Sequence, residues 1–226
     1  MRILLIISAI IFLIGCSKKE LNEPASVSIR IDINRAQSSS GHLEFDYGYI
    51  RLASFGVEGV RQEGPEVELS KEFETGNVHT FSSTAPVSNL DIAIPQGNYI
   101  DLDINFNTFD DNGDPTILVE GIYKNQASQN IPVRFEFLSS ESFSINSEAE
   151  DGNSVIELDK DFNSNALITL DPIYWFDLIS INSWENATLT EINGEMTILI
   201  NESVNSSIYD NVVDRIDEQT SSVFSN

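Results

Sequence analysis

Residues 26–34 read SVSIRIDIN, and this stretch indicates the kind of fold that the chain adopts. Val27, Ile29, Ile31 and Ile33 alternate with polar residues. Successive side chains of a β-strand point to opposite faces, so this alternation predicts a strand with one buried and one solvated face. Such a strand belongs in a sheet that lies on a hydrophobic core.

The same period of two recurs along the chain. It is clearest in LDIAI (90–94), YIDLDINF (99–106) and IPVRFEFL (131–138). Weaker strand candidates are residues 49–60, 66–73, 78–81, 117–123, 142–145, 155–158 and 166–170. Turn-forming Gly, Pro, Asn and Asp residues separate most of these segments. Many short strands with polar turns predict a mainly β fold, an antiparallel β-sandwich.

The C-terminal quarter has a different pattern. In VNSSIYDNVVDRIDE (204–218), Val204, Ile208, Val212 and Ile216 stand four residues apart. This spacing predicts an amphipathic helix over about 203–220. Two shorter elements precede it. Asp171 and Pro172 favour a short helix in IYWFDLI, because Asp suits the N-cap and Pro the first turn. EMTILI (195–200) predicts another strand. We therefore expect one domain, residues 26–226, with a C-terminal helical element.

The N-terminus is an apolar segment with a single cysteine behind it. Residues 3–14 read ILLIISAIIFLI, after the positive start Met1-Arg2. A helix needs about 20 apolar residues to span a bilayer, so this run of twelve suits the apolar region of a signal peptide. The run ends in LIGC (13–16), and Cys16 is the only cysteine in the chain. With no second cysteine, the fold contains no internal disulfide.

The tetrad LIGC resembles the lipobox of bacterial lipoproteins. The resemblance implies that residues 1–15 are removed as a lipoprotein signal peptide, and that Cys16 receives a diacylglyceryl thioether and an N-acyl chain such as palmitate. Two or more acyl chains anchor a protein stably in a membrane. The alternative is an ordinary signal peptide or N-terminal anchor with an incidental cysteine. Residues 16–25 then form the lipidated cysteine and a polar tether.

A second resemblance concerns the fold. The IPQGNY turn (94–99), ILVEGIY (117–123), IPVRFEF (131–137) and a late VIEL (155–158) follow one another as in the uncharacterised prealbumin-like β-sandwich lipoproteins of Bacteroidota. The likeness covers residues 26–170. It implies an immunoglobulin-like or prealbumin-like sandwich in the cell envelope, and it carries no assigned chemistry. With no Asp after Cys16, the resemblance places the anchor in the outer membrane and leaves its leaflet open.

The chain is strongly acidic, with 36 Asp and Glu against 12 Lys and Arg and a net charge of −24. Phosphate backbones and anionic lipid surfaces would be repelled, so the charge excludes nucleic acid as a partner. Solubility explains the acidic surface better than cation binding does. One turn nevertheless resembles a calcium loop, because Asp110, Asn112 and Asp114 occupy alternate positions. The EF-hand spacing fails beyond it, and turn formation is the favoured interpretation.

No catalytic constellation is evident. The nucleophile elbow G-x-S-x-G is missing, and His42 and His79 are expected to be solvated surface residues. Tyr174, Trp175 and Trp184 are candidates for a sugar-stacking platform, although core packing is the commoner use of such residues. We therefore expect a non-catalytic protein that binds or presents a glycan, a partner protein or an envelope component. The alternatives are a secreted hydrolase with paired carboxylates, or a structural subunit of a surface fibre.

Overall fold

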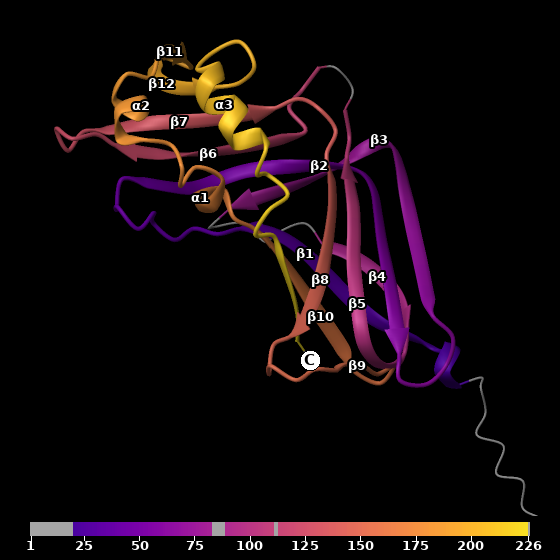
Figure 1. Cartoon of the computed structure of the whole chain (residues 1–226). Coiled ribbons are helices and arrows are strands. Elements are labelled where there is room, and N and C mark those ends of the chain that lie inside the picture. Colours follow the sequence, from indigo (N-terminus) through magenta and orange to yellow (C-terminus); the bar gives the residue numbers. More distant parts are fainter. Residues whose placement is uncertain (1–19, 83–88, 111–112, 226) are drawn as a thin grey trace, which may run out of the picture.

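The computed structural model describes residues 20–82, 89–110 and 113–225. Within them, thirteen strands form one continuous sheet, and three short helices lie over part of it (Figure 1). The predicted mainly β fold class is confirmed. The lipidation residue Cys16 lies outside the described residues.

Most strands follow the predicted alternation. The strands are β1 (Pro24–Ile33), β2 (Leu43–Arg61), β3 (Val67–Ser82), β4 (Asn89–Pro95), β5 (Gly97–Thr108), β6 (Ile117–Lys124), β7 (Asn130–Phe137), β8 (Ser142–Ala149), β9 (Ile156–Leu158), β10 (Asn163–Leu170), β11 (Leu189–Ile192), β12 (Glu195–Ile200) and β13 (Ser221–Ser225). The helices are α1 (Pro172–Trp175), α2 (Ile181–Glu185) and α3 (Ser206–Val213). A short 3-10 helix, Glu20–Asn22, precedes β1. The two candidates at 66–73 and 78–81 merge into one strand, β3.

β1 shows why the opening pattern produces a strand. Ala25, Val27, Ile29 and Ile31 are fully buried, and Ile33 is nearly so. Burying an aliphatic side chain of this size contributes roughly 1.5–3 kcal/mol relative to leaving it in water. β1 pairs in parallel with β10 and antiparallel with β4, so its backbone is hydrogen-bonded on both sides. It begins at Pro24, two residues inside the segment predicted to be a tether.

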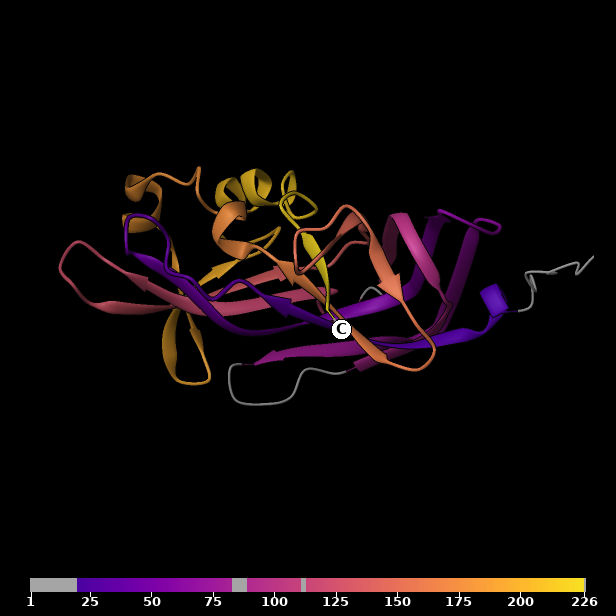
Figure 2. The ribbon, with the colours of Figure 1, turned by 90° about the horizontal axis from the view of Figure 1, so that it is seen from below.

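The sheet divides at β2, the longest strand. The first half of β2 pairs with β6 and the second half with β5, whereas β3 follows its other edge along most of its length. The strands on the β6 side continue through β7 and β12 to β11. Those on the β5 side continue through β8, β13, β10 and β1 to β4. This second part curls until β1 and β4 approach β3, and it turns away from the helix-covered part (Figure 2).

The sheet is mixed, although we expected antiparallel pairing alone. Among the described strands, three pairs are parallel: β1 with β10, β7 with β12, and β8 with β13. The partners in each pair are separated by more than 50 residues, and the chain between them crosses over other elements. Sequence alternation reports which face of a strand is buried, and it carries no information on strand direction.

The predicted C-terminal helix is present but shorter. α3 covers Ser206–Val213, and turns follow it. Ile216, the last member of the four-residue pattern, is fully buried in these turns. The chain then forms β13, which lies between β8 and β10. β13 is not among the predicted strands. It has five residues and two buried side chains, Ser222 and Phe224, which is too short for a clear alternation of polar and apolar residues.

A second difference concerns His79, which we expected at the surface. It lies in β3 opposite Ile50 of β2 and is almost fully buried. Successive side chains of a strand point to opposite faces, so His79 lies on the opposite face from its more exposed neighbours Val78 and Thr80, and that face is buried.

Candidate functional site

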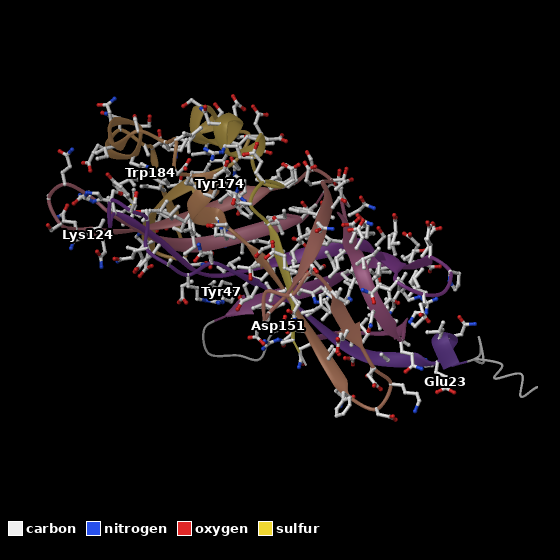
Figure 3. All side chains as sticks on the ribbon, turned by 60° about the horizontal axis from the view of Figure 1, so that its bottom comes forward. Glu23, Tyr47, Lys124, Asp151, Tyr174 and Trp184 are labelled. Atoms are coloured by element: carbon white, nitrogen blue, oxygen red, sulfur yellow. The ribbon has the colours of Figure 1, made fainter. Side chains whose placement is uncertain are left out.

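A hollow in the described part of the molecule lies between the β1–β2 loop and the segment that carries α1 and α2. Its volume is about 520 Å³. We call it the α1–α2 groove. Its walls are made by Ser38, Ser39, Ser40, His42, Tyr123, Asp171, Tyr174, Phe176, Leu178, Ile181 and Trp184, among others. Tyr174 and Trp184 lie toward the end of the molecule opposite Glu23 (Figure 3).

Asp171 joins the two walls of the groove. Its Oδ1 accepts a hydrogen bond from the backbone N–H of Tyr174 (3.1 Å), which caps α1, and Pro172 starts the helix as predicted. Its Oδ2 accepts from the Asn34 side chain (3.0 Å), at the start of the β1–β2 loop. A single carboxylate therefore fixes the loop relative to α1.

The floor of the groove is aromatic. Phe176 lies 5.2 Å from Phe45 and meets Phe135 edge-on at 5.6 Å, measured between ring centroids. Trp184 stacks on Tyr123 at 5.1 Å with an interplanar angle of 15°. Aromatic pairs of this kind add about 0.5–1.5 kcal/mol beyond the burial of their area. The floor is thus a rigid part of the core.

A hydrogen bond holds α2 against β6. The hydroxyl of Tyr123 donates to Oε1 of Glu185 at 2.7 Å, and the backbone N–H of Gln126 donates to the same oxygen at 2.9 Å. These two bonds lower the pKa of Glu185, the Tyr123 hydroxyl most. The pKa of Tyr123 is raised, first by burial and then by Glu185.

The outer rim combines a cation with apolar side chains. The Arg215 guanidinium lies 4.1 Å from the ring centroid of Tyr174, and its Nη1 is 2.6 Å from Oδ1 of Asp177. One face of Tyr174 is therefore covered. Beside it, Leu178 and Ile181 expose 71% and 42% of their surfaces. Both side chains line the groove and give it an apolar rim, and ligand sites are lined predominantly by such residues.

His42 is a groove residue that sequence reasoning missed. Its Nδ1 is 2.7 Å from the carbonyl oxygen of Lys124, and it must carry the proton because a carbonyl only accepts. Nε2 is then the acceptor of the ring. The half-buried ring lies 6.3 Å from Tyr123. The local sequence does not predict this position, because His42 and its partner Lys124 are 82 residues apart in the chain.

The three predicted platform residues have different surroundings. Trp175 is fully buried and its ring lies against Phe135 of β7, so none of its surface is open to a ligand. Trp184 lines the groove, but Tyr123 and Phe176 lie against its ring. Tyr174 alone combines partial exposure with a position on the groove wall.

Two of the three predicted calcium ligands lie within the described residues. Asn112 lies outside the described residues. Asp110 and Asp114 are exposed, and Oδ2 of Asp114 is 4.0 Å from Nη1 of Arg51. Among the described residues, no three His, Cys, Asp or Glu side chains gather as a metal-binding group. The Ca²⁺ site stays a prediction.

Comparison with known protein families, with curated proteins and with solved structures finds no match for this chain. The helices in the described ranges have at most eight residues, and none could cross a bilayer.

Proposed function

We propose that the chain is a lipid-anchored protein of the outer membrane whose domain binds a ligand, without catalysis, in the α1–α2 groove. The LIGC tetrad supports the anchor at Cys16. The groove supports the binding role, and the observation that carries it is the exposed pair Leu178 and Ile181 beside a rigid aromatic floor.

The groove favours an amphiphilic ligand. Leu178, Ile181 and Tyr174 offer apolar surface, whereas Ser38–Ser40 and Ser180 supply hydroxyl groups around it. Sites of this composition bind the apolar part of a ligand and orient it with a few polar contacts. Among a glycan, a partner protein and an envelope component, we favour an envelope component with an acyl or other apolar portion.

The carboxylates of the groove support binding over hydrolysis. Asp171 uses both oxygens to cap α1 and to hold Asn34. Asp177 forms an ion pair with Arg215. A glycosidase needs two carboxylates that are free to exchange protons with substrate, and these two are engaged in structural contacts.

We infer that the curled part of the sheet corresponds to the prealbumin-like sandwich of the lipoproteins that the sequence resembles. Strands β3, β2 and β5 would form one layer, and β10, β1 and β4 the other. The buried side chains of both groups belong to one hydrophobic cluster, as the two inner faces of a sandwich do.

Two experiments test the proposal. Cys16→Ser should move the protein from the membrane fraction to unprocessed precursor, and unchanged fractionation would reject the anchor. For the groove, the neutral apolar dye Nile red serves as the probe. Ile181→Asp and Leu178→Asp should each weaken its binding at least fivefold. Met196→Asp, which changes an apolar residue of β12 whose exposure lies between those of Ile181 and Leu178, is the matched control and should bind as the native chain does. Equal binding by all variants would reject the groove.

One observation favours a second candidate function, the fibre subunit. Within the described residues, β3 pairs only with β2 and β4 only with β1. Between their open edges lies a hollow of about 310 Å³ lined by Phe55, Leu69, Phe73, Leu90 and Ile92. An extended strand from another copy could add to such edges. Native mass measurement at micromolar concentration distinguishes the two, because a fibre subunit forms oligomers.

A further inference from the structure

The point at which the chain enters the fold is held rigidly. Arg61, only 5% exposed, donates hydrogen bonds to the carbonyl oxygens of Leu21, Gln96 and Pro65, the last two at 3.0 Å. The backbone N–H of Gln96 donates to the carbonyl oxygen of Glu23 at 2.8 Å. Leu21 and Glu23 are therefore fixed to the turns at one end of the sheet.

These hydrogen bonds of Arg61 and Gln96, which we call the Arg61 clamp, leave only a short connection between the fixed end of the domain and the proposed anchor at Cys16. Only four residues, Ser17–Glu20, separate Cys16 from Leu21. A fully extended chain advances at most about 3.6 Å per residue, so Leu21 lies within about 18 Å of Cys16 along the chain. A lipid attached to the sulfur of Cys16 would hold this end of the domain close to the membrane.

The turn between β9 and β10 lies at the same end. Lys160 lies with its Nζ 3.9 Å from Oε2 of Glu23, and its backbone N–H donates to the side chain of Gln96 at 3.3 Å. The turn is closed by hydrogen bonds to Asp159 from the backbone N–H groups of Asp161 (2.8 Å) and Phe162 (3.2 Å). Phe162 nevertheless exposes 66% of its surface.

We propose that this end of the domain, formed by Leu21–Glu23, Gln96 and Asp159–Phe162, rests on the bilayer and that Phe162 enters its interface. The inference rests on the proposed anchor at Cys16. Aromatic side chains favour the boundary between headgroups and acyl chains. Because Glu23, Asp159 and Asp161 outnumber Lys160, the surface suits zwitterionic headgroups rather than anionic ones.

This orientation places the α1–α2 groove away from the membrane. Glu23 marks one end of the molecule, and Tyr174 and Trp184 lie toward the other (Figure 3). The groove would then open toward the solvent side of the membrane to which the protein is attached.

The test uses the single cysteine. The described core side chains lie between Ala25 and Phe224, so a chain that begins at Cys16 keeps all of them. Such a chain can be coupled through Cys16 to a maleimide lipid in phosphatidylcholine vesicles. In Phe162→Trp, lipids brominated near the headgroup should reduce the added tryptophan emission at least twofold. In the control Met196→Trp, on β12 and outside the groove lining, they should reduce it little. Equal quenching in the two variants would overturn the proposal.

Chemical coupling separates this result from the anchor itself. If Cys16→Ser leaves fractionation in cells unchanged, the lipoprotein assignment fails, but the coupled chain still reports how the domain lies on a bilayer. If Cys16 is lipidated in cells and the added emission of the Phe162→Trp variant stays unquenched, the anchor stands and the proposed contact of Phe162 is wrong.

Discussion

Tyr123 of β6 donates its hydroxyl hydrogen to Glu185 at the end of α2, at 2.7 Å and across 62 residues of sequence. Gln126 donates its backbone N–H to the same oxygen. The α2 wall of the α1–α2 groove is therefore attached to the sheet by the stacking of Trp184 on Tyr123 and by two hydrogen bonds whose strength depends on the charge of Glu185.

We expect the contribution of Glu185 to stability to depend on pH. Its pKa is lower in the folded chain than the ordinary 4.5, so the contribution is complete above that value and is lost as the pH falls through the lower folded pKa. The difference in melting temperature between the native chain and Glu185→Gln should therefore shrink as the pH is lowered from about 7 to values below about 4.5. Glu191→Gln, on the exposed edge strand β11, is the control. A difference that stays constant over this range would contradict the assignment.

Arg61→Met should destabilise the domain by about 3 kcal/mol or more, because it leaves the carbonyl oxygens of Leu21, Gln96 and Pro65 without their buried donor. Chemical denaturation measures this loss. Arg30→Met removes an exposed arginine of β1 and should change the free energy of unfolding by less than about 0.5 kcal/mol. Similar free energies of unfolding for the two variants would show that the hydrogen bonds of Arg61 contribute nothing to stability.

Gly121→Ala should prevent stable folding or cost about 3 kcal/mol or more. A Cβ at this position of β6 would lie 2.0 Å from the carbonyl oxygen of Glu44 and 2.8 Å from Cα of Phe45, both backbone atoms of β2. Gly152→Ala is the comparison. Nothing lies within 4 Å of its Cβ, but its φ of +75° costs an alanine roughly 1 kcal/mol. Thermal melting should rank the two variants in this order.

Besides Tyr123, two further tyrosines should ionise late. Burial raises the pKa of Tyr99 to about 12, and its hydroxyl donates to the Pro95 carbonyl at 2.5 Å. Burial, followed by Glu202, raises that of Tyr209 to about 12. Their contribution to stability is complete below pH 10 and is lost as the pH rises from about 10 to about 12. Tyrosinate absorbance should show this late phase, and Tyr99→Phe should reduce it by one residue. An unchanged late phase in that variant would contradict the assignment.

Sequence reasoning worked where the physical signal is local. The alternation of Val27, Ile29 and Ile31 is a property of a few neighbouring residues, and it located β1 within two residues of its start. Asp171 and Pro172 likewise predicted the beginning of α1, because N-capping involves residues three apart.

It failed where the deciding contact is distant. His42 reaches the groove through a bond to Lys124, and Leu178 becomes part of its rim only because the β1–β2 loop lies opposite. The same limit applies to Trp175. The sequence left open whether it belongs to a platform or, as is commoner, to the core, and packing against Phe135 buries it. No periodicity carries this information, because the partners lie on other elements.

The position of β13 has a consequence for how the chain reaches its native state. In the described part of the sheet, β8 and β10 are joined only through this strand, which pairs antiparallel with β10 at Ala166 and parallel with β8 at Ser147. Until residues 221–225 have left the ribosome and any translocation channel, the sheet has an open slot in its middle. The domain therefore cannot finish folding progressively from its N-terminus, and a truncation before Ser221 would leave two strand edges exposed to aggregation.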